Sequence, residues 1–168
     1  MEAFEEIYRA SSGYVYTVAY GITASREDAE EVTQDVFVKI YRKLGGFGFR
    51  SSFKTWIYRI TANTAINRYR KKAKRFRRER PLDEVLSRVI PGEKGDEKFD
   101  ADHNRTLVDS MLKSLPPDQR ACVVLREIEG LKYEEIARTL EIKINTVKTR
   151  LKRARKKLMT IYGKGEKP

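Results

Sequence analysis

The strongest constraint on the fold is a basic segment near the C-terminal end, residues 143–157, which reads KINTVKTRLKRARKK. It holds eight basic residues and no acidic one, and apolar residues recur at Val147, Leu151, Ala154 and Leu158. This spacing predicts a helix with an apolar stripe and a basic outer face. Residues 133–140, YEEIARTL, predict a shorter helix, and residues 141–143 a turn between the two. Together they predict a helix-turn-helix, whose second helix can enter the DNA major groove.

A solvated amphipathic helix with an ordinary charged face is the alternative interpretation of this segment. The single sign of the charge, the short preceding helix and the tight turn together favour DNA binding. Lys132 and Lys143 stand where Ser, Thr, Asp or Asn normally caps a helix, and a missing cap costs about 1 kcal/mol. Glu134 and Glu135 offset part of the first loss through the helix dipole. Lys143 has no such compensation, so we infer that its ammonium group is placed for a phosphate.

Composition narrows the class of protein. The 168 residues are 40% hydrophobic and 36% charged, which suits a soluble globular protein with one or two small cores. No apolar run reaches membrane-spanning length, and the start MEAFEEIY does not resemble a signal sequence, so we expect a cytoplasmic protein. The single Cys122 excludes an intramolecular disulfide, and with the single His103 it cannot form a Cys/His zinc cluster. We expect Cys122 to be a buried small apolar residue.

The net charge of +12 is concentrated in two parts of the chain. Residues 68–80 hold nine basic and one acidic residue, and residues 106–168 hold fifteen basic and eight acidic residues. Nucleic acid is the natural partner of two separate positive surfaces. Residues 81–105 are acidic on balance and lack sustained periodicity, which predicts a flexible linker between an N-terminal domain, residues 1–80, and a C-terminal domain, residues 106–168. The apolar residues of this linker suit a short helix, a docking segment or a transient turn: Leu82, Val85, Leu86, Val89 and Ile90.

The N-terminal domain predicts three helices. Ser25 and Asp28 resemble a capping box before the second helix, which a Gly-Gly pair at 45–46 ends. Ser52 is placed to cap a third helix that runs on into the basic stretch. The predicted fold class is therefore all-α, with two small helical domains and a helix-turn-helix in the second.

Three blocks of sequence occur in the order and spacing of one known family. They are DAEEVTQDVFVKIYRKLGGF at 28–47, SSFKTWIYRITANTAINRYR at 51–70, and LPPDQRACVVLREIEGLKYEEIARTLEIKINTVKTRLKRARKKL at 115–158. They resemble the extracytoplasmic-function sigma factors of bacterial RNA polymerase. The resemblance implies a promoter-recognition subunit of stress-responsive transcription, without catalytic activity, cofactor or metal. It implies core polymerase binding through the first domain and linker, melting of the −10 element, −35 recognition, and control by an anti-sigma factor.

The resemblance and the chemistry of the side chains give candidates for each contact. Melting needs positive charge for the separated strand, flat side chains for unstacked bases, and amides for base edges. Candidates for the −10 element are Phe47, Phe49, Ser51, Trp56, Asn63, Asn67, Arg68, Tyr69, Arg70 and Lys71. Candidates for the −35 element are Lys143, Asn145, Thr146, Lys148, Thr149, Arg150, Lys152 and Arg153, with Arg150 favoured as a bidentate reader of guanine. The resemblance places the polymerase clamp on Glu31, Gln34, Asp35, Phe37, Val38 and Tyr41.

Some of these residues also have an ordinary structural interpretation. Trp56 has the spacing of a core aromatic, and Asn63 and Asn67, one turn apart, also suit a solvent-facing helix. The carboxylates of Asp28, Glu31 and Asp35 lie near one helix face, but an open helix face rarely encloses a divalent ion, so we predict no metal site.

The sequence departs from the pattern of the family at four places. Phe47-Gly48-Phe49 stands where many relatives have Phe-Arg-Gly, and Asn67 replaces a common Asp. The preferred −10 base is therefore not carried over. Glu141 and Asn145 stand where Gly is frequent, which puts the geometry of the turn in question.

Two other functions account for only part of these features. A stand-alone transcriptional regulator with a helical sensor domain would bind duplex DNA tightly without polymerase. An enzyme acting on nucleic acid is disfavoured, since the sequence shows no nucleophile-base pair, phosphate-binding glycine loop or metal cluster.

Overall fold

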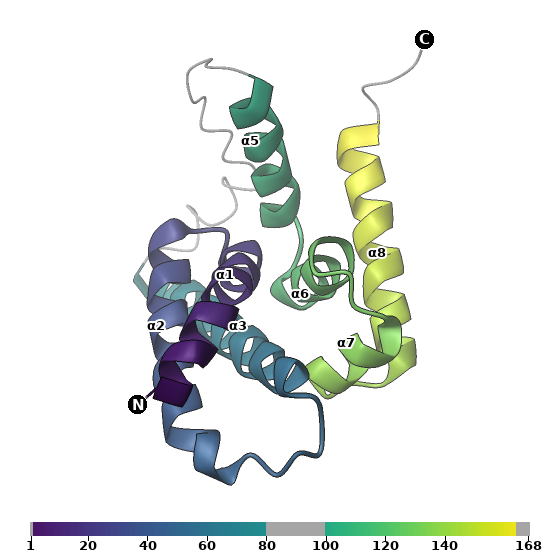
Figure 1. Cartoon of the computed structure of the whole chain (residues 1–168). Helices are drawn as coiled ribbons and strands as arrows, with labels where there is room; N and C mark the ends of the chain where they lie inside the picture. Colours follow the sequence, from purple (N-terminus) through teal and green to yellow (C-terminus); the bar gives the residue numbers. More distant parts are fainter. Residues whose placement is uncertain (1, 80–99, 164–168) are drawn as a thin grey trace.

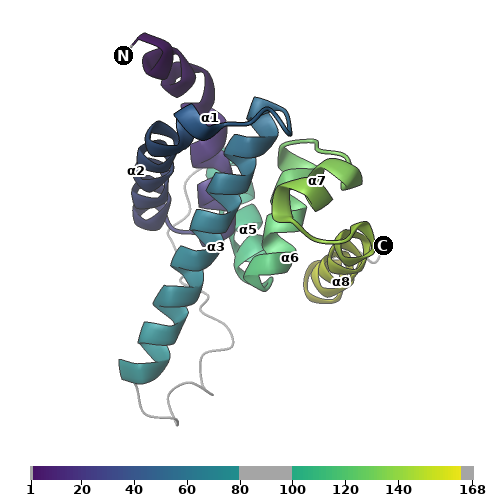
Figure 2. The same ribbon diagram turned by 90° about the horizontal axis from the view of Figure 1, so that it is seen from below.

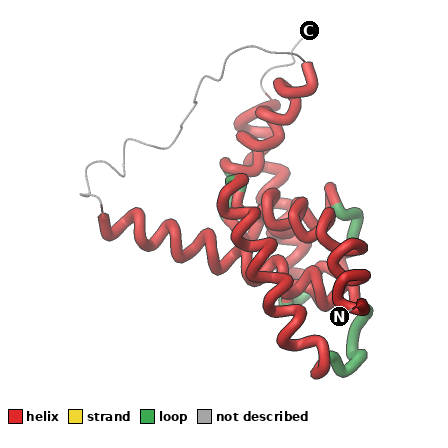
Figure 3. The backbone as a smooth tube through the Cα atoms, turned by 60° about the vertical axis from the view of Figure 1, so that its left-hand side comes forward, coloured by secondary structure: helices red, strands yellow, loops and turns green. Residues whose placement is uncertain are grey.

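The structure is a computed structural model that describes residues 2–79 and 100–163. In these ranges the chain forms helices joined by short loops (Figure 1). In the N-terminal half these are α1 (Glu2–Thr23), α2 (Arg26–Lys43), the 3-10 turn η1 (Leu44–Gly46) and α3 (Phe53–Glu79). The C-terminal half holds α5 (Asp100–Lys113), α6 (Pro117–Val123), the π-helical turn η2 (Val124–Ile128), α7 (Tyr133–Leu140) and α8 (Ile144–Tyr162). Figure 3 shows helices and loops and no strand in these ranges, which confirms the predicted all-α class.

The predicted linker falls largely outside the described residues, and so do Leu82, Val85, Leu86, Val89 and Ile90. The linker is predicted to end at residue 105, whereas α5 already begins at Asp100.

The predicted helix starts of the N-terminal domain are present. The Ser25 hydroxyl accepts a hydrogen bond from the Asp28 amide at 3.3 Å, and the Ser52 hydroxyl accepts one from the Thr55 amide at 3.1 Å. Each bond satisfies a backbone N–H that the first helical turn leaves without a partner. The glycine pair ends α2 through the single turn of η1, whose 3-10 geometry closes with the Phe47 amide bonded to the Leu44 carbonyl at 3.1 Å.

The helices α1, α2 and α3 pack together as one three-helix unit (Figure 1). Its core is formed by buried apolar residues of all three helices: Val15, Val18, Ile22, Ala29, Val32, Val36, Ile40, Ile57 and Ala62. The C-terminal half of α3 extends away from this unit (Figure 2). The basic stretch is therefore presented on a helix with open sides.

The C-terminal helices are held by the apolar stripe of α8. Val147, Leu151 and Ala154 are buried, as the spacing predicts, and α6 and α7 pack on them. Cys122 on α6 is fully buried, which confirms its assignment as a core residue. Burial raises the pKa of its thiol to about 11, so the thiol stays protonated at neutral pH.

The two domains share one continuous core rather than two separate ones. Helix α1 lies so close to η2 that a Cβ atom on Gly21 would meet Val124 at 2.6 Å. The sequence pattern predicts two domains but not this contact. Among the described residues no helix is long and apolar enough to cross a membrane.

Candidate nucleic-acid interface

The first helix and the turn of the helix-turn-helix have the predicted limits, 133–140 and 141–143, whereas α8 continues beyond the basic segment to Tyr162. Glu141 adopts the left-handed conformation in the turn, at φ 55° and ψ 44°. The Ile142 amide donates to the Ala137 carbonyl at 3.0 Å and closes the end of α7. A glycine adopts this conformation without a steric cost, so Glu141 introduces local strain at this position.

The starts of α7 and α8 differ in how their backbone is satisfied. The Glu135 carboxylate accepts a hydrogen bond from the Lys132 amide at 2.7 Å, which is one half of a capping box. This bond adds to the dipole effect that the sequence indicates. Lys143 is exposed, has extended backbone angles and makes no side-chain cap, so its ammonium group faces solvent at the start of α8.

The outer face of α8 presents most of the predicted −35 residues. Exposed side chains on or beside it are Lys143, Asn145, Lys148, Thr149, Lys152 and Arg153. Thr146 and Arg150 are half-buried on the flank of the apolar stripe. Burial raises the pKa of Cys122, whereas the positive charge of Arg150 and a hydrogen bond from it lower that pKa in part. The Arg150 side chain therefore reaches toward α6. Arg153 is the more accessible of the two arginines.

The amides of Asn63 and Asn67 lie on the exposed face of α3, while the intervening Thr64, Ala65 and Ile66 are buried. Continuing this face at helical spacing gives Lys71, Lys74 and Arg78, all exposed. We call these five residues the α3 track: Asn63, Asn67, Lys71, Lys74 and Arg78. The track runs for about 22 Å along the helix at roughly 1.5 Å per residue. Lys74 and Arg78 belong to the basic run at 68–80, and only the helical spacing on α3 aligns them with the two amides.

An aromatic cluster joins the loop before α3 to the first turn of that helix. The Phe47 ring lies 4.8 Å from that of Phe49, 5.3 Å from Phe53 and 5.1 Å from Trp56, between centroids. Phe47 and Trp56 are half-buried, whereas Phe49 is 85% exposed and has a φ of 51°. Positive φ is strained and rare for a bulky residue, and residues strained in this way occur most often at functional sites. Ser51, also half-buried, lies in the same loop.

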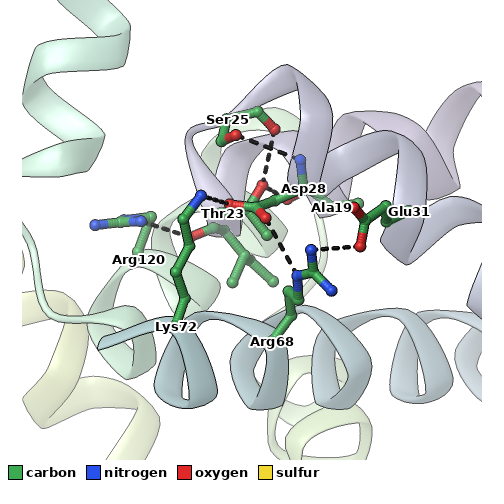
Figure 4. Close-up of polar contacts among 9 residues, drawn as sticks. Ala19, Thr23, Ser25, Asp28, Glu31, Arg68, Lys72 and Arg120 are labelled. Atoms are coloured by element: carbon green, nitrogen blue, oxygen red, sulfur yellow. Dashed lines mark hydrogen bonds and ion pairs between the residues drawn. The ribbon is translucent and has the colours of Figure 1, made fainter. Parts of the chain in front are cut away.

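Three of the residues predicted to contact the −10 element have partners within the protein. Arg68 pairs with Asp28 at 3.2 Å and with Glu31 (Figure 4). Arg70 binds Asp118 through hydrogen bonds of 3.0 and 3.1 Å. The ring of Tyr69 lies 4.9 Å from the guanidinium carbon of Arg120. Sequence spacing alone could not find these partners, because Asp118 and Arg120 are about 50 residues away in the other domain.

Asp28 is a buried carboxylate at the junction of α2 and α3. Lys72 bonds it at 2.6 Å, on the side opposite Arg68 (Figure 4). Burial by itself raises the pKa of Asp28, but the bonds and charges of Lys72 and Arg68 outweigh burial and leave the pKa below its usual value. The acidic face considered above for a metal thus has Asp28 and Glu31 engaged with cations of α3.

Replacing this carboxylate should make stability depend less on pH. A carboxyl whose pKa is lower in the folded chain stabilises the fold above its unfolded pKa of about 3.9, and the effect disappears as pH falls through the folded pKa. We expect Asp28→Asn to lower the free energy of unfolding by about 2 kcal/mol at pH 7 and by progressively less below about pH 4. Urea unfolding across pH measures this, with the exposed Glu30→Gln on the same helix as control. A difference that stays constant down to pH 2 would contradict the assignment.

An aromatic groove lies between the start of α1 and α2. Its lining includes Phe4, Tyr8, Phe37, Val38 and Tyr41. The Tyr41 ring lies 5.3 Å from Phe4, and the Tyr8 ring 4.6 Å from Phe37. Gln34 lines the same groove, Asp35 is exposed nearby, and Glu31 is the partner of Arg68. The contribution of α1 was missed, because Phe4 and Tyr8 fit the inward periodicity of their own helix.

Two family descriptions match the chain. "Sigma-70 region 2" matches residues 7–75, and "Sigma-70, region 4" matches residues 105–158. The first covers most of the three-helix unit and the α3 track up to Lys74, and the second covers the helix-turn-helix up to Leu158.

Relatives match over most of the chain. The ECF RNA polymerase sigma factor SigE of Mycolicibacterium smegmatis is 35% identical over 165 residues, which are 98% of this chain and 63% of that protein. The sigma-E factor of Escherichia coli is 35% identical, covering 76% of this chain and 70% of that protein. SigW of Bacillus subtilis is 30% identical, and the match covers 94% of this chain and 87% of that protein. The chain thus spans a little under two thirds of the M. smegmatis protein.

Two solved structures share the fold at 23% identity. The structure of CnrH in complex with the cytosolic domain of CnrY has a TM-score of 0.71 and covers 98% of this chain and 90% of that chain. The sigma factor RpoE in complex with the anti-sigma factor NepR, from Bartonella quintana, has a TM-score of 0.68 and covers 99% and 100%.

Proposed function

This chain belongs to the extracytoplasmic-function sigma factors, and from that premise we propose that it is a promoter-specificity subunit of bacterial RNA polymerase. It binds the polymerase core, recognises −35 and −10 elements, and promotes melting for initiation in the cytoplasm. The observation that carries the proposal is the presence on one chain of two different exposed surfaces whose side chains suit DNA. One is a helix-turn-helix with an exposed basic face, and the other combines amides, cations and aromatic rings around α3. Sigma factors direct transcription without being catalysts, so no reaction is assigned.

In the proposed −35 contact, α8 enters the major groove with its N-terminal half. Thr149 and Arg153 lie on its exposed face, and Arg150 joins them when its guanidinium turns away from Cys122. Arginine can pair bidentately with guanine, whereas the threonine hydroxyl can either donate a hydrogen bond to a base edge or accept one from it. The remaining candidates for the −35 contact bind phosphate or lie beside the DNA major groove: Lys143, Asn145, Thr146, Lys148 and Lys152. Phosphate contacts fix the position of the helix and carry no sequence information.

In the proposed −10 contact, Asn63 reads an unpaired base and Asn67 supports it. Phe49 offers a solvent-facing ring on which such a base can stack. Phe47 packs against that ring, and Trp56 packs against Phe47. Ser51 borders the same loop. Lys71 continues the α3 track along the separated strand. Arg68, Tyr69 and Arg70 take part only after exchanging their internal partners for DNA.

The groove between α1 and α2 is the proposed docking surface for the polymerase clamp. Exposed aromatic residues on a monomer mark sites of protein contact. Phe37, Val38 and Tyr41 supply the apolar part, with Gln34 and Asp35 as polar neighbours, while Glu31 orients Arg68. Both structural neighbours named above are complexes of a sigma-type fold with a partner protein, one of them an anti-sigma factor. We propose an anti-sigma factor as a further partner of this chain.

The deciding experiment uses core polymerase and permanganate footprinting on duplex promoters. We expect melting of the −10 element only when this chain and core are both present. A stand-alone regulator would instead shift duplex DNA equally well without core.

Asn63→Ala should reduce melting of the preferred −10 sequence about tenfold and change preference at one position, since a lost base-edge contact is worth about 1–3 kcal/mol. Asn104→Ala, an exposed amide on α5, is the matched control. If Asn63→Ala melts every −10 variant as well as the parent chain, the base-reading role is wrong.

A further inference from the structure

The cations of α3 lie on more than one face of the helix. Lys71 belongs to the α3 track, whereas Lys72, the next residue, lies about 100° further round the helix and reaches toward α2. Arg68 lies one helical turn before Lys72, on the same side. Figure 4 shows both side chains extending from α3 to the carboxylates of α2. These two cations therefore face α2, away from the centre of the track.

Two carboxylates of α2 receive these cations. Asp28 lies 2.6 Å from the Lys72 ammonium nitrogen and 3.2 Å from the Nε atom of Arg68, and Glu31 pairs with a terminal nitrogen of the same guanidinium group. We call these four residues the α2–α3 charge cluster: Asp28, Glu31, Arg68 and Lys72. Its two negative and two positive groups cancel, so the cluster adds no net charge to this flank of α3.

The burial of Asp28 opposes opening of the cluster. Its side chain is 6% exposed, whereas that of Lys72 is 59% exposed. Burial by itself raises the pKa of Asp28, but Lys72 and Arg68 hold that pKa below its usual value, so the carboxylate is charged at neutral pH. A strand that drew either cation away would leave this buried charge poorly compensated, which is costly. The pair of Arg70 with Asp118 opens more easily, because Asp118 is 35% exposed.

A carboxylate offers these cations the same kind of contact as a DNA phosphate, a charged oxygen that accepts strong hydrogen bonds. The carboxylates are already fixed beside their cations, whereas a strand loses translational and rotational freedom when it binds. The internal contact is therefore favoured. Phosphate contacts set the register of a nucleic acid on a protein. Available cations on a second flank of α3 would support further registers, in which Asn63 faces no base.

We propose that Asp28 and Glu31 are specificity-determining residues, which substitute for DNA phosphate at Arg68 and Lys72 and confine the separated strand to the α3 track. Wrong registers bind any sequence without using the base contact, so preventing them raises discrimination between sequences. This inference rests on the proposed function, because it concerns the strand that α3 is proposed to bind.

Two neighbouring lysines give the first test, on the full chain with a labelled single strand of scrambled sequence. Lys71→Gln removes a cation of the track, so affinity should fall about fivefold at 0.1 M salt and the slope of log affinity against log salt by about 0.7. Lys72→Gln removes a cation that Asp28 already occupies, and affinity should change less than about twofold. Equal losses from the two substitutions would overturn the proposal, because Lys72 would then already contact the strand.

Releasing Lys72 is the second test. Asp28→Asn should tighten binding of the scrambled strand about fivefold and raise the salt slope by about 0.7, since one cation becomes available to phosphate. Adding Lys72→Gln to Asp28→Asn should remove this gain. Glu30→Gln is the charge-matched control, because Glu30 is exposed on the same helix. Thermal melting checks that each variant is folded, and a folded Asp28→Asn chain that binds no more tightly than Glu30→Gln would contradict the proposal.

The polymerase complex separates this inference from the proposed function. There, Asp28→Asn should reduce discrimination between the preferred −10 strand and the scrambled strand about fivefold, because only the scrambled strand gains affinity. If the parent complex prefers no sequence while the free chain responds as described, the proposed function fails and the restraint on the two cations stands. If the parent complex melts promoters and Asp28→Asn keeps full discrimination, the proposed function stands and the carboxylates do not determine specificity.

Discussion

Neutralising the cations of the α3 track should weaken capture of the separated −10 strand about 100-fold. Lys71, Lys74 and Arg78 lie on one exposed face of α3, in line with Asn63 and Asn67. Each phosphate contact on single-stranded DNA contributes about 0.7 to the slope of log affinity against log salt, so three contacts contribute roughly two log units at 0.1 M salt. We expect the combined change to Gln to reduce the slope by about 2. Titration of a single-stranded −10 oligonucleotide with the polymerase complex measures both quantities.

The matched control is a second triple on α8, Lys148, Lys152 and Lys156 to Gln. These cations share an exposed face of the helix-turn-helix, and Lys148 and Lys152 are proposed to contact duplex −35 DNA. The α8 triple should lower the salt slope for the −35 duplex and leave capture of the single strand unchanged, while the α3 triple does the reverse. Equal losses on both DNAs from either triple would mean that charge acts only through the overall field of the protein.

Local features were predictable because their causes lie within a few residues. Ser25 and Ser52 cap helices through amides three positions away, and the apolar stripe of α8 follows from helical spacing alone. The limits of the first helix and of the turn in the helix-turn-helix followed in the same way. Cys122 could be assigned to the core from its apolar neighbours in the sequence.

Contacts between distant segments were not predictable, because no periodicity encodes a partner on another helix. Arg68 looked like a residue for the DNA strand, yet Asp28 and Glu31 engage it within the three-helix unit. Arg120 is buried at 1% exposure, and its guanidinium satisfies carbonyls of Leu112 and Ile22 from the two domains. Glu141 stands at a position that favours glycine, but the sequence does not identify Arg59, 3.2 Å away on α3, as its partner.

The second large expected effect is a loss of polymerase binding when the aromatic groove between α1 and α2 is altered. Tyr41 is 65% exposed and its ring packs edge-on against Phe4, so a partner that fills the groove buries both rings. Exposed aromatic residues of this kind are frequent hot spots, at 2 kcal/mol or more each. We expect Tyr41→Ala to weaken binding to core polymerase about 30-fold without DNA present. Tyr41→Phe keeps the ring and should stay within about twofold.

Fluorescence anisotropy of labelled chain titrated with core polymerase gives these affinities, and thermal melting checks that both variants are folded. Tyr41 lies on the edge of the groove rather than in the core, so its truncation should leave the melting temperature nearly unchanged. Because the groove involves α1 as well as α2, Tyr8→Ala should also weaken binding, by less than Tyr41→Ala since Tyr8 is less exposed. Unchanged core affinity in both alanine variants would remove the groove from the polymerase interface and move the contact to another face of α2.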